Sequence, residues 1–249
     1  MGPGLRHDWG KIMSWFSALY RSAVGKKAVM AVTGIILFGF IVLHLIGNLK
    51  LYEPGLYKAP GETGPGVHYI NAYGVFLRHV GEPALPAYGA LWIVRVILLV
   101  AVILHIWAAW QLTLMSRAAR PRAYTSRPKI HTTYASRTLR WGGVIILLFV
   151  IYHLLDFTFG TVNPGFVEGD VYRNVVASFS RWYVSLFYIL AQLALGLHLY
   201  HGLWSLFQSL GWSHPRFNRW RSGFAHAFAW IITIGNVSFP LAVLTGLIH

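Results

Sequence analysis

The sequence predicts an all-α integral membrane protein: a bundle of five transmembrane helices, preceded by an amphipathic helix on the membrane surface. Hydrophobic residues make up 56% of the 249-residue chain and charged residues 11%, whereas soluble domains usually carry about 25% charged residues. Five apolar segments each reach the ~20 residues that cross the hydrocarbon core of a bilayer. They lie at about 27–49, 87–115, 139–160, 182–209 and 224–247.

The N-terminal region differs from the rest of the chain. Residues 9–23 combine helical spacing of apolar side chains with basic flanks, a pattern typical of a helix that lies in the membrane interface. The first apolar segment follows Lys26 and Lys27 and has no small-residue cleavage site after it, so we expect a retained helix and not a signal peptide. We therefore divide the chain into a cytoplasmic arm, 1–26, and a transmembrane domain, 27–249.

The distribution of charge predicts the orientation. The stretches 50–86 and 161–181 connect helices on one side of the membrane, and 116–138 and 210–223 connect them on the other. Most of the 21 basic residues lie in the arm and in the second pair of connections, whereas nearly every acidic residue lies on the first side. The positive-inside rule then predicts a cytoplasmic N-terminus and an external C-terminus. Orientation explains the net charge of +14, and we expect no nucleic-acid partner.

Four histidines lie inside otherwise apolar segments: His44, His105, His153 and His198. An ionisable side chain there is a functional hypothesis by default. At 1.5 Å per helical residue, His44 and His153 lie about 9 and 10 Å from the outer boundary, and His105 and His198 about 27 and 25 Å. We call His44 with His153 the outer pair and His105 with His198 the inner pair.

Two histidines can fill both axial positions of a haem iron, and helical bundles hold cofactors by side chains on facing helices. The histidine pattern therefore predicts two bis-histidine haems b at two levels. His201 follows His198 by three residues on a similar helix face, so it could replace His198 or donate to a haem propionate. The alternative is a set of polar core residues bonded to backbone carbonyls. The absence of cysteine excludes thiolate ligation and an iron–sulfur cluster held by this chain.

Three charged residues, Glu82, Arg95 and Asp156, are candidates for a role near the outer pair. Arg95 lies about 12 Å into the second helix from the outer side, where it needs an anionic partner such as a haem propionate or Asp156, unless it snorkels to the headgroups. Asp156 is the only carboxylate within the apolar segments. It could take part in proton exchange near the outer pair, together with Glu82, or only neutralise Arg95.

The sequence resembles the cytochrome b membrane subunit of succinate dehydrogenase and fumarate reductase, of the five-helix, single-chain, two-haem kind found in many bacteria. The resemblance therefore implies a bacterial inner membrane. The stretches that carry the resemblance are 25–34 (GKKAVMAVTG), 44–49 (HLIGNL) and 198–211 (HLYHGLWSLFQSLG). The resemblance extends over nearly the whole chain. It implies axial ligation by histidines on the first four helices, the first paired with the third and the second with the fourth. In the family pattern the fourth-helix ligand stands thirteen residues before the closing glycine, which favours His198 over His201.

The resemblance also implies partners and a reaction. A flavoprotein subunit with covalent FAD and an iron–sulfur subunit would dock on the cytoplasmic face, and a membrane quinone, more often menaquinone, would exchange electrons with the anchor. Guided by the resemblance, we expect the quinone pocket near the outer pair, with Glu82, Arg95 and Asp156 as candidate residues. This chain would catalyse only the quinone half-reaction, because nothing in it resembles a dicarboxylate or FAD site. The complex could form a higher oligomer. Some fumarate-reducing relatives carry a glutamate two residues before the fourth-helix ligand, where this chain has Gly196, so that proton pathway is not expected.

Rival functions follow from the same features. The nearest is the di-haem subunit of another respiratory complex, such as a formate dehydrogenase or nitrate reductase. The cytochrome b of the quinol–cytochrome c complex fits less well, because it places two haem ligands on each of two helices. A haem-free transporter or a purely structural anchor is the alternative of another class.

Overall fold

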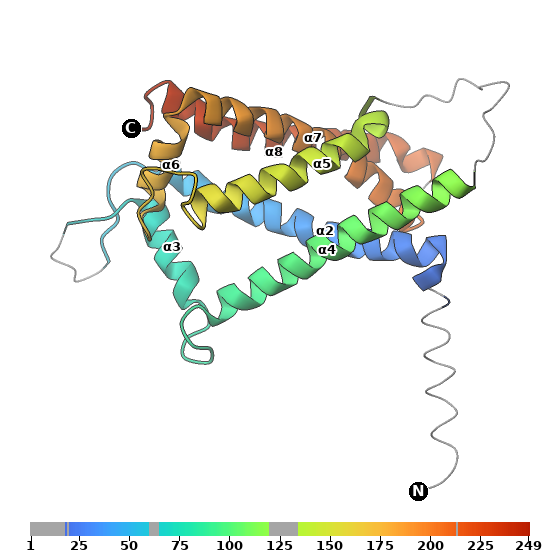
Figure 1. The fold of residues 1–249 in the computed structure, drawn as a ribbon, viewed down its shortest axis with the longest axis horizontal. Coiled ribbons are helices and arrows are strands. Elements are labelled where there is room, and N and C mark those ends of the chain that lie inside the picture. Colours follow the sequence, from blue (N-terminus) through green and yellow to red (C-terminus); the bar gives the residue numbers. More distant parts are fainter. Residues whose placement is uncertain (1–17, 19, 60–64, 120–133, 213) are drawn as a thin grey trace, which may run out of the picture.

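The computed structural model describes residue 18 and residues 20–59, 65–119, 134–212 and 214–249, and these form a helical bundle (Figure 1). No strand occurs among these residues, and one isolated antiparallel bridge joins Tyr57 and Val67. The predicted interfacial helix at 9–23 lies largely outside the described residues. The elements in chain order are α2 (Ala23–Asn48), the 3₁₀ turn η1 (Leu49–Tyr52), α3 (Tyr69–His79), α4 (Gly89–Ala118), α5 (Tyr134–Phe157), α6 (Val171–Phe179), α7 (Trp182–Ser209) and α8 (Pro215–Leu244).

Five of these helices are long and apolar enough to cross a membrane, namely α2, α4, α5, α7 and α8. The prediction of an all-α protein with five transmembrane helices is confirmed. Four of the five begin and end within a few residues of the predicted bounds. Their apolar length explains the agreement, because a helix satisfies every backbone polar group internally where no water can.

The fifth helix begins earlier than predicted. We expected it at residue 224, after a connection at 210–223, but α8 begins at Pro215. Pro215 occupies the first turn, where its missing N–H costs nothing, and the ring of His214 accepts a hydrogen bond from the backbone N–H of Arg216. The predicted connection was therefore too long, and Arg216, Arg219 and Arg221 lie in the helix.

One of these arginines also joins two helices. Arg221 is only 2% exposed. Its guanidinium lies over the Trp204 ring of α7, 4.4 Å from the centroid, and donates to the carbonyl of Trp212 at 2.8 Å. Gly211, with φ of 78°, makes the turn between the helices, a left-handed conformation that glycine adopts without steric cost. The short connection is thus held by the first turns of α8.

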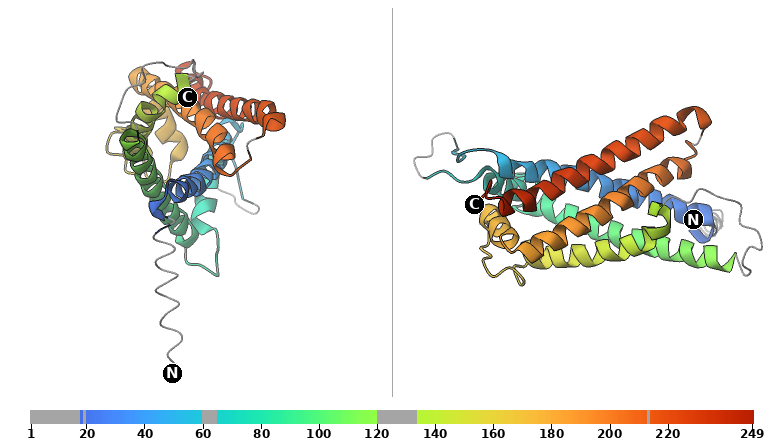
Figure 2. Two further views of the ribbon diagram at one scale, coloured as in Figure 1. Left: turned by 90° about the vertical axis from the view of Figure 1, so that its right-hand side faces the viewer. Right: turned by 90° about the horizontal axis from the view of Figure 1, so that it is seen from above.

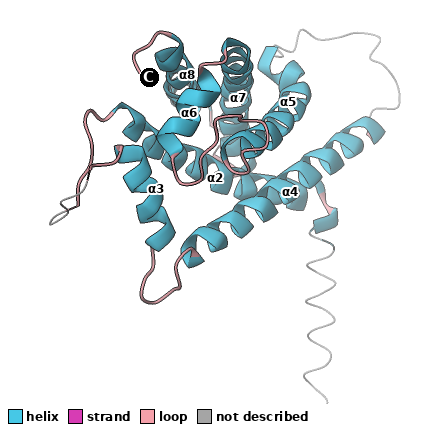
Figure 3. Cartoon of the chain, turned by 60° about the vertical axis from the view of Figure 1, so that its left-hand side comes forward, coloured by secondary structure: helices cyan, strands magenta, loops and turns pink. Residues whose placement is uncertain are grey.

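Two short helices cover one end of the bundle. We treated 50–86 and 161–181 as connections only, but they contain α3 and α6, which lie near each other (Figure 3). Asp170 joins them, because its carboxylate accepts from the backbone N–H of Arg173 at 3.1 Å and from the side-chain amide of Asn71 at 2.9 Å. A helix N-terminus favours such an acidic cap. We call this end, which also carries the C-terminus, the capped end.

Helix α7 lies at the centre of the packing. It packs closely against α8 on one side and against α5 on the other, whereas α2 packs mainly against α4 (Figure 2). The buried apolar residues gather along α7 and α8 and continue into the capped end. The least buried of the five spanning helices is α4. The fold therefore has a tightly packed half, α5–α7–α8, and a second pair, α2–α4, beside it.

Candidate functional site

The outer pair comes together near the capped end. His44 lies in the last turn and a half of α2, and His153 lies four residues before the end of α5. Their ring centroids are 5.8 Å apart, with the ring planes at 87°. Phe40 stacks on His44 at 5.2 Å, and Phe149 and Phe157 flank His153 at 5.7 and 5.5 Å. Two half-buried imidazoles thus face each other within an aromatic wall.

The inner pair comes together nearer the opposite end. His105 of α4 and His198 of α7 have ring centroids 6.3 Å apart and ring planes at 61°. Gly34 of α2 adjoins this pair, because a Cβ added there would lie 3.6 Å from Cε1 of His105. The structure therefore brings together the same two pairs that the depth of the residues along their helices predicts.

Each pair joins two helices that do not pack closely against each other. Among the described residues, the close helix contacts are α2–α4, α5–α7 and α7–α8, and neither α2–α5 nor α4–α7 belongs to this set. Two imidazole nitrogens that share one metal ion each lie about 2 Å from it, which places the ring centroids about 6 Å apart once the nitrogen-to-centre distance is added. The observed separations of 5.8 and 6.3 Å fit this arrangement. The two histidines of each pair therefore have the spacing that would let them hold a haem between them.

A threonine orients the His105 ring. The Thr33 hydroxyl donates to the backbone carbonyls of Val29 at 2.8 Å and Met30 at 3.2 Å. Its oxygen lies 3.1 Å from Nδ1 of His105. Because its proton is already used, the hydroxyl accepts from an Nδ1–H. That leaves Nε2 unprotonated, which is the form that binds a metal.

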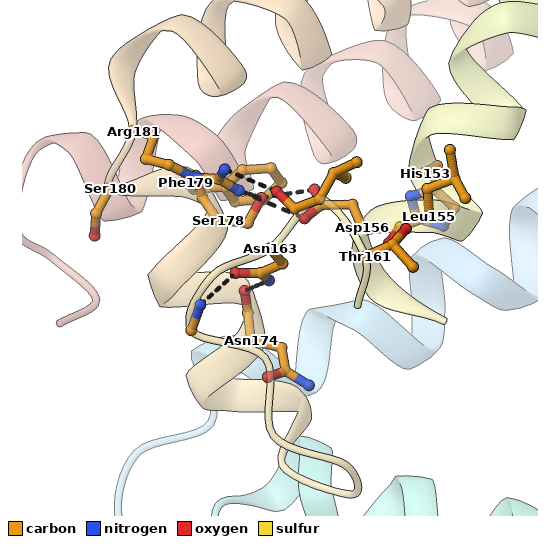
Figure 4. Close-up of polar contacts among 12 residues, drawn as sticks. His153, Leu155, Asp156, Thr161, Asn163, Asn174, Ser178, Phe179, Ser180 and Arg181 are labelled. Carbon is orange, nitrogen blue, oxygen red and sulfur yellow. Dashed lines mark hydrogen bonds and ion pairs between the residues drawn. The ribbon is translucent and has the colours of Figure 1, made fainter. Parts of the chain in front are cut away.

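A tyrosine occupies the equivalent position behind His153. The Tyr188 hydroxyl of α7 donates to Oδ2 of Asp156 at 2.9 Å and lies 3.5 Å from Nδ1 of His153. The Ser178 hydroxyl donates to the same carboxylate oxygen at 2.6 Å. Figure 4 shows Asp156 with Ser178 and Arg181, and His153 nearby, where α5 ends. His153 is therefore connected through one phenol to a carboxylate that is 0% exposed.

The ion-pair partner of Asp156 differs from the one that we considered. We considered Arg95, but the structure places Arg181 beside it, with 3.6 Å between a guanidinium nitrogen and Oδ1. Arg181 stands at the start of α7 and also donates to the carbonyl of Val162 at 2.9 Å. The interpretation of Asp156 as the neutralising partner of Arg95 was therefore wrong. The reason is that Arg181, three residues after Ser178, reaches the buried carboxylate from the cap.

Arg95 and Glu82 lie apart from this cluster. Arg95 is exposed on α4, and its guanidinium lies 5.0 Å from the centroid of the Trp92 ring. Glu82 pairs with His79 at 3.2 Å on the exposed surface of the cap. Neither makes a hydrogen bond or ion pair with Asp156 among the described residues. The three predicted quinone-site residues therefore do not form one cluster, and their roles stay predictions.

His201 points to a partner within its own helix. Its Nε2 lies 3.2 Å from the Ser205 hydroxyl, one turn further along α7. His198, by contrast, has its ring opposite His105, and its buried Nδ1 has no hydrogen-bond partner among the described residues. This geometry favours His198 as the partner of His105.

Three residues that contact these histidines and Asp156 escaped the sequence analysis: Thr33, Tyr188 and Arg181. Depth could have identified two of them. Tyr188 lies ten residues before His198 on one helix, a rise of about 15 Å that reaches the outer level. Thr33 lies eleven residues before His44, which likewise reaches the inner level. Arg181 carried no such indication, because it lies in a connection whose path the sequence does not predict.

Comparison with known protein families identifies a match for this chain. Residues 113–237 match the family model described as "Succinate dehydrogenase/Fumarate reductase transmembrane subunit". The matched region contains His153, His198, Asp156 and Tyr188, and spans from the end of α4 into α8. No curated protein and no solved structure matches the chain.

Proposed function

We propose that this chain, which belongs to the succinate dehydrogenase/fumarate reductase transmembrane subunit family, is the haem b-bearing membrane anchor of a succinate:quinone oxidoreductase. It is a multi-pass membrane protein of a complex with the catalytic subunits of that family. The observation that carries the haem assignment is the pair of imidazole contacts at 5.8 and 6.3 Å. Each contact spans two helices that do not pack closely against each other.

Each histidine has a defined part in this proposal. His44 and His153 would hold one haem b, and His105 and His198 the other. Haem b, when bound, supplies a one-electron redox couple at each level of the membrane. The hydroxyls of Thr33 and Tyr188 keep the Nδ1 of His105 and His153 protonated and leave Nε2 free. The side chains of Phe40, Phe149 and Phe157 surround the outer pair.

The exposed charges support a polarity for the complex. Lys27, Arg117, Arg140, Arg216 and Arg219 are all exposed at the end opposite the cap. We assign this end to the cytoplasm of a bacterium, where the iron–sulfur and flavoprotein subunits would dock and the FAD and iron–sulfur clusters would lie. We place the quinone, in our proposal menaquinone, toward the capped end, with Glu82 and Arg95 as its polar candidates. Asp156 is a weaker candidate for the quinone site than these two residues, because it is buried and paired with Arg181.

The test is a spectrum of the purified complex. The dithionite-reduced minus oxidised difference spectrum should show b-type bands, and haem extraction should give about two haems per chain. Absence of these bands in a complex that retains its catalytic subunits would contradict the haem proposal. It would favour a haem-free anchor of the same family.

A further inference from the structure

We propose that Tyr188 and Asp156 are positioning residues that tune the outer haem through His153. In this proposal the phenol holds the imidazole in one tautomer, and the carboxylate behind it lowers the midpoint potential of the haem that His153 ligates. The inference rests on the proposed function, because it concerns the haem of the outer pair. It adds a role for a buried cluster that ligation alone does not require.

The direction of the hydrogen bonds is the first step. A phenol has one proton, and Tyr188 donates it to Oδ2 of Asp156 at 2.9 Å. Its oxygen can then only accept from Nδ1 of His153, at 3.5 Å. The resulting series of hydrogen bonds runs from the imidazole N–H to the phenol and from the phenol to the carboxylate. A ligand histidine that donates to such an acceptor becomes a stronger electron donor to its metal.

Burial gives the charge its effect. Asp156 and Ser178 are each 0% exposed, and Tyr188 is 4% exposed. Charges interact far more strongly in such surroundings than in water. A negative charge near a haem favours the oxidised, more positive iron, and the cation of Arg181 at 3.6 Å opposes that effect. Asp156 and Arg181 should therefore move the potential in opposite directions.

The inner pair provides an internal comparison. His105 contacts the Thr33 hydroxyl, which donates to two backbone carbonyls. These acceptors are neutral, unlike the carboxylate of Asp156. No acidic residue takes part in that contact. Changes at Asp156, Tyr188 and Arg181 should therefore act on the outer haem and leave the inner one unchanged.

The experiment is a redox titration of both haems in the assembled complex. Asp156→Asn removes the negative charge and leaves Arg181 uncompensated, so the outer midpoint should rise. Tyr188→Phe removes the phenol from this series of hydrogen bonds and should also raise the outer midpoint, whereas Arg181→Gln should lower the outer midpoint. We expect a change of about tenfold in the ratio of reduced to oxidised outer haem at a fixed potential, or ~59 mV for a one-electron couple.

The matched control is Tyr152→Phe. Tyr152 is the residue before His153, and its ring lies 6.1 Å from that of Tyr188, but its hydroxyl makes no hydrogen bond among the described residues, so the potential should not move. Opposite shifts for Asp156→Asn and Arg181→Gln support the proposal. Absent or same-sign shifts for these two variants overturn it. If Asp156→Asn loses the outer haem, Tyr188→Phe takes its place in the comparison: a rise of the midpoint in Tyr188→Phe and a fall in Arg181→Gln support the proposal, and any other result overturns it. A wild-type complex without haem overturns the proposed function instead.

Discussion

At the scale of single residues, neighbouring histidines on one helix have different surroundings. His198 and His201 lie three residues apart on α7, yet only His198 has its ring opposite His105. The Nε2 of His201 is hydrogen-bonded to the Ser205 hydroxyl instead. A ligand must present a free ring nitrogen to its metal, so these contacts separate two residues that spacing alone leaves equivalent.

Separate substitutions should distinguish the two histidines. His198→Gln should lower haem content from about two to about one per chain and remove the inner haem, because no second imidazole then faces His105. His201→Gln should retain two low-spin haems, since it removes only the contact with Ser205. Haem extraction and low-temperature spectra of the complex measure both. Loss of the inner haem in His201→Gln with its retention in His198→Gln would reverse the assignment.

The outer pair should behave as one unit. His44→Ala and His153→Ala should each remove the outer haem and largely spare the inner one, because each variant leaves that iron with a single imidazole. His226→Gln is the matched control: its ring contacts Tyr200 and Ser222 and belongs to neither pair. Redox-resolved spectra should show the inner haem unchanged in all three. Loss of the inner haem first would contradict the pairing.

At the scale of helices, the packing of α7 against α8 explains why position 196 is a glycine. The position is buried where α7 meets α8, and a Cβ there would collide with the Thr233 hydroxyl. Thr233 is β-branched and donates to the carbonyl of Ala229 at 2.7 Å, so its side chain has little freedom to move. In this chain position 196 therefore serves helix packing, and there is no room for a glutamate.

Paired glycine substitutions test this contact. Gly196→Ala should destabilise the protein by about 1–3 kcal/mol, the usual cost of overpacking. Gly202→Ala, six residues further along α7, meets nothing within 4 Å and should be neutral or stabilising by up to about 1 kcal/mol, because alanine favours the helix. Thermal unfolding in detergent measures both. Adding Thr233→Ala to Gly196→Ala should recover part of the loss, and an unchanged melting temperature for Gly196→Ala would refute the packing argument.

At the scale of the whole molecule, the described charges are distributed unevenly between the two ends. The acidic residues Glu53, Glu82, Glu168 and Asp170 lie at the capped end, whereas most of the exposed basic residues lie at the opposite end. Such a separation is what the positive-inside rule requires of a multi-pass protein. The capped end should therefore face the outside of the cell.

Reporter fusions test this orientation. Alkaline phosphatase is active only outside the cytoplasm, so a fusion after His249 should be active, and a green fluorescent protein fusion at the N-terminus should fluoresce. The matched control places phosphatase in the connection after α4, where it should be inactive. An inactive C-terminal phosphatase together with an active one after α4 would invert the orientation and move the proposed docking face to the capped end.

The sequence by itself determined the properties that follow from distance along a helix. Apolar length predicted five spanning helices, and the rise per residue sorted four histidines into two levels, because both depend only on position along the chain. Tertiary structure decided the neighbours. It placed Tyr188 behind His153, gave Asp156 to Arg181 and not to Arg95, and formed α3 and α6 into a cap. These contacts depend on how helices rotate and pack against one another, and on the path of the connections, which hydrophobic length does not specify.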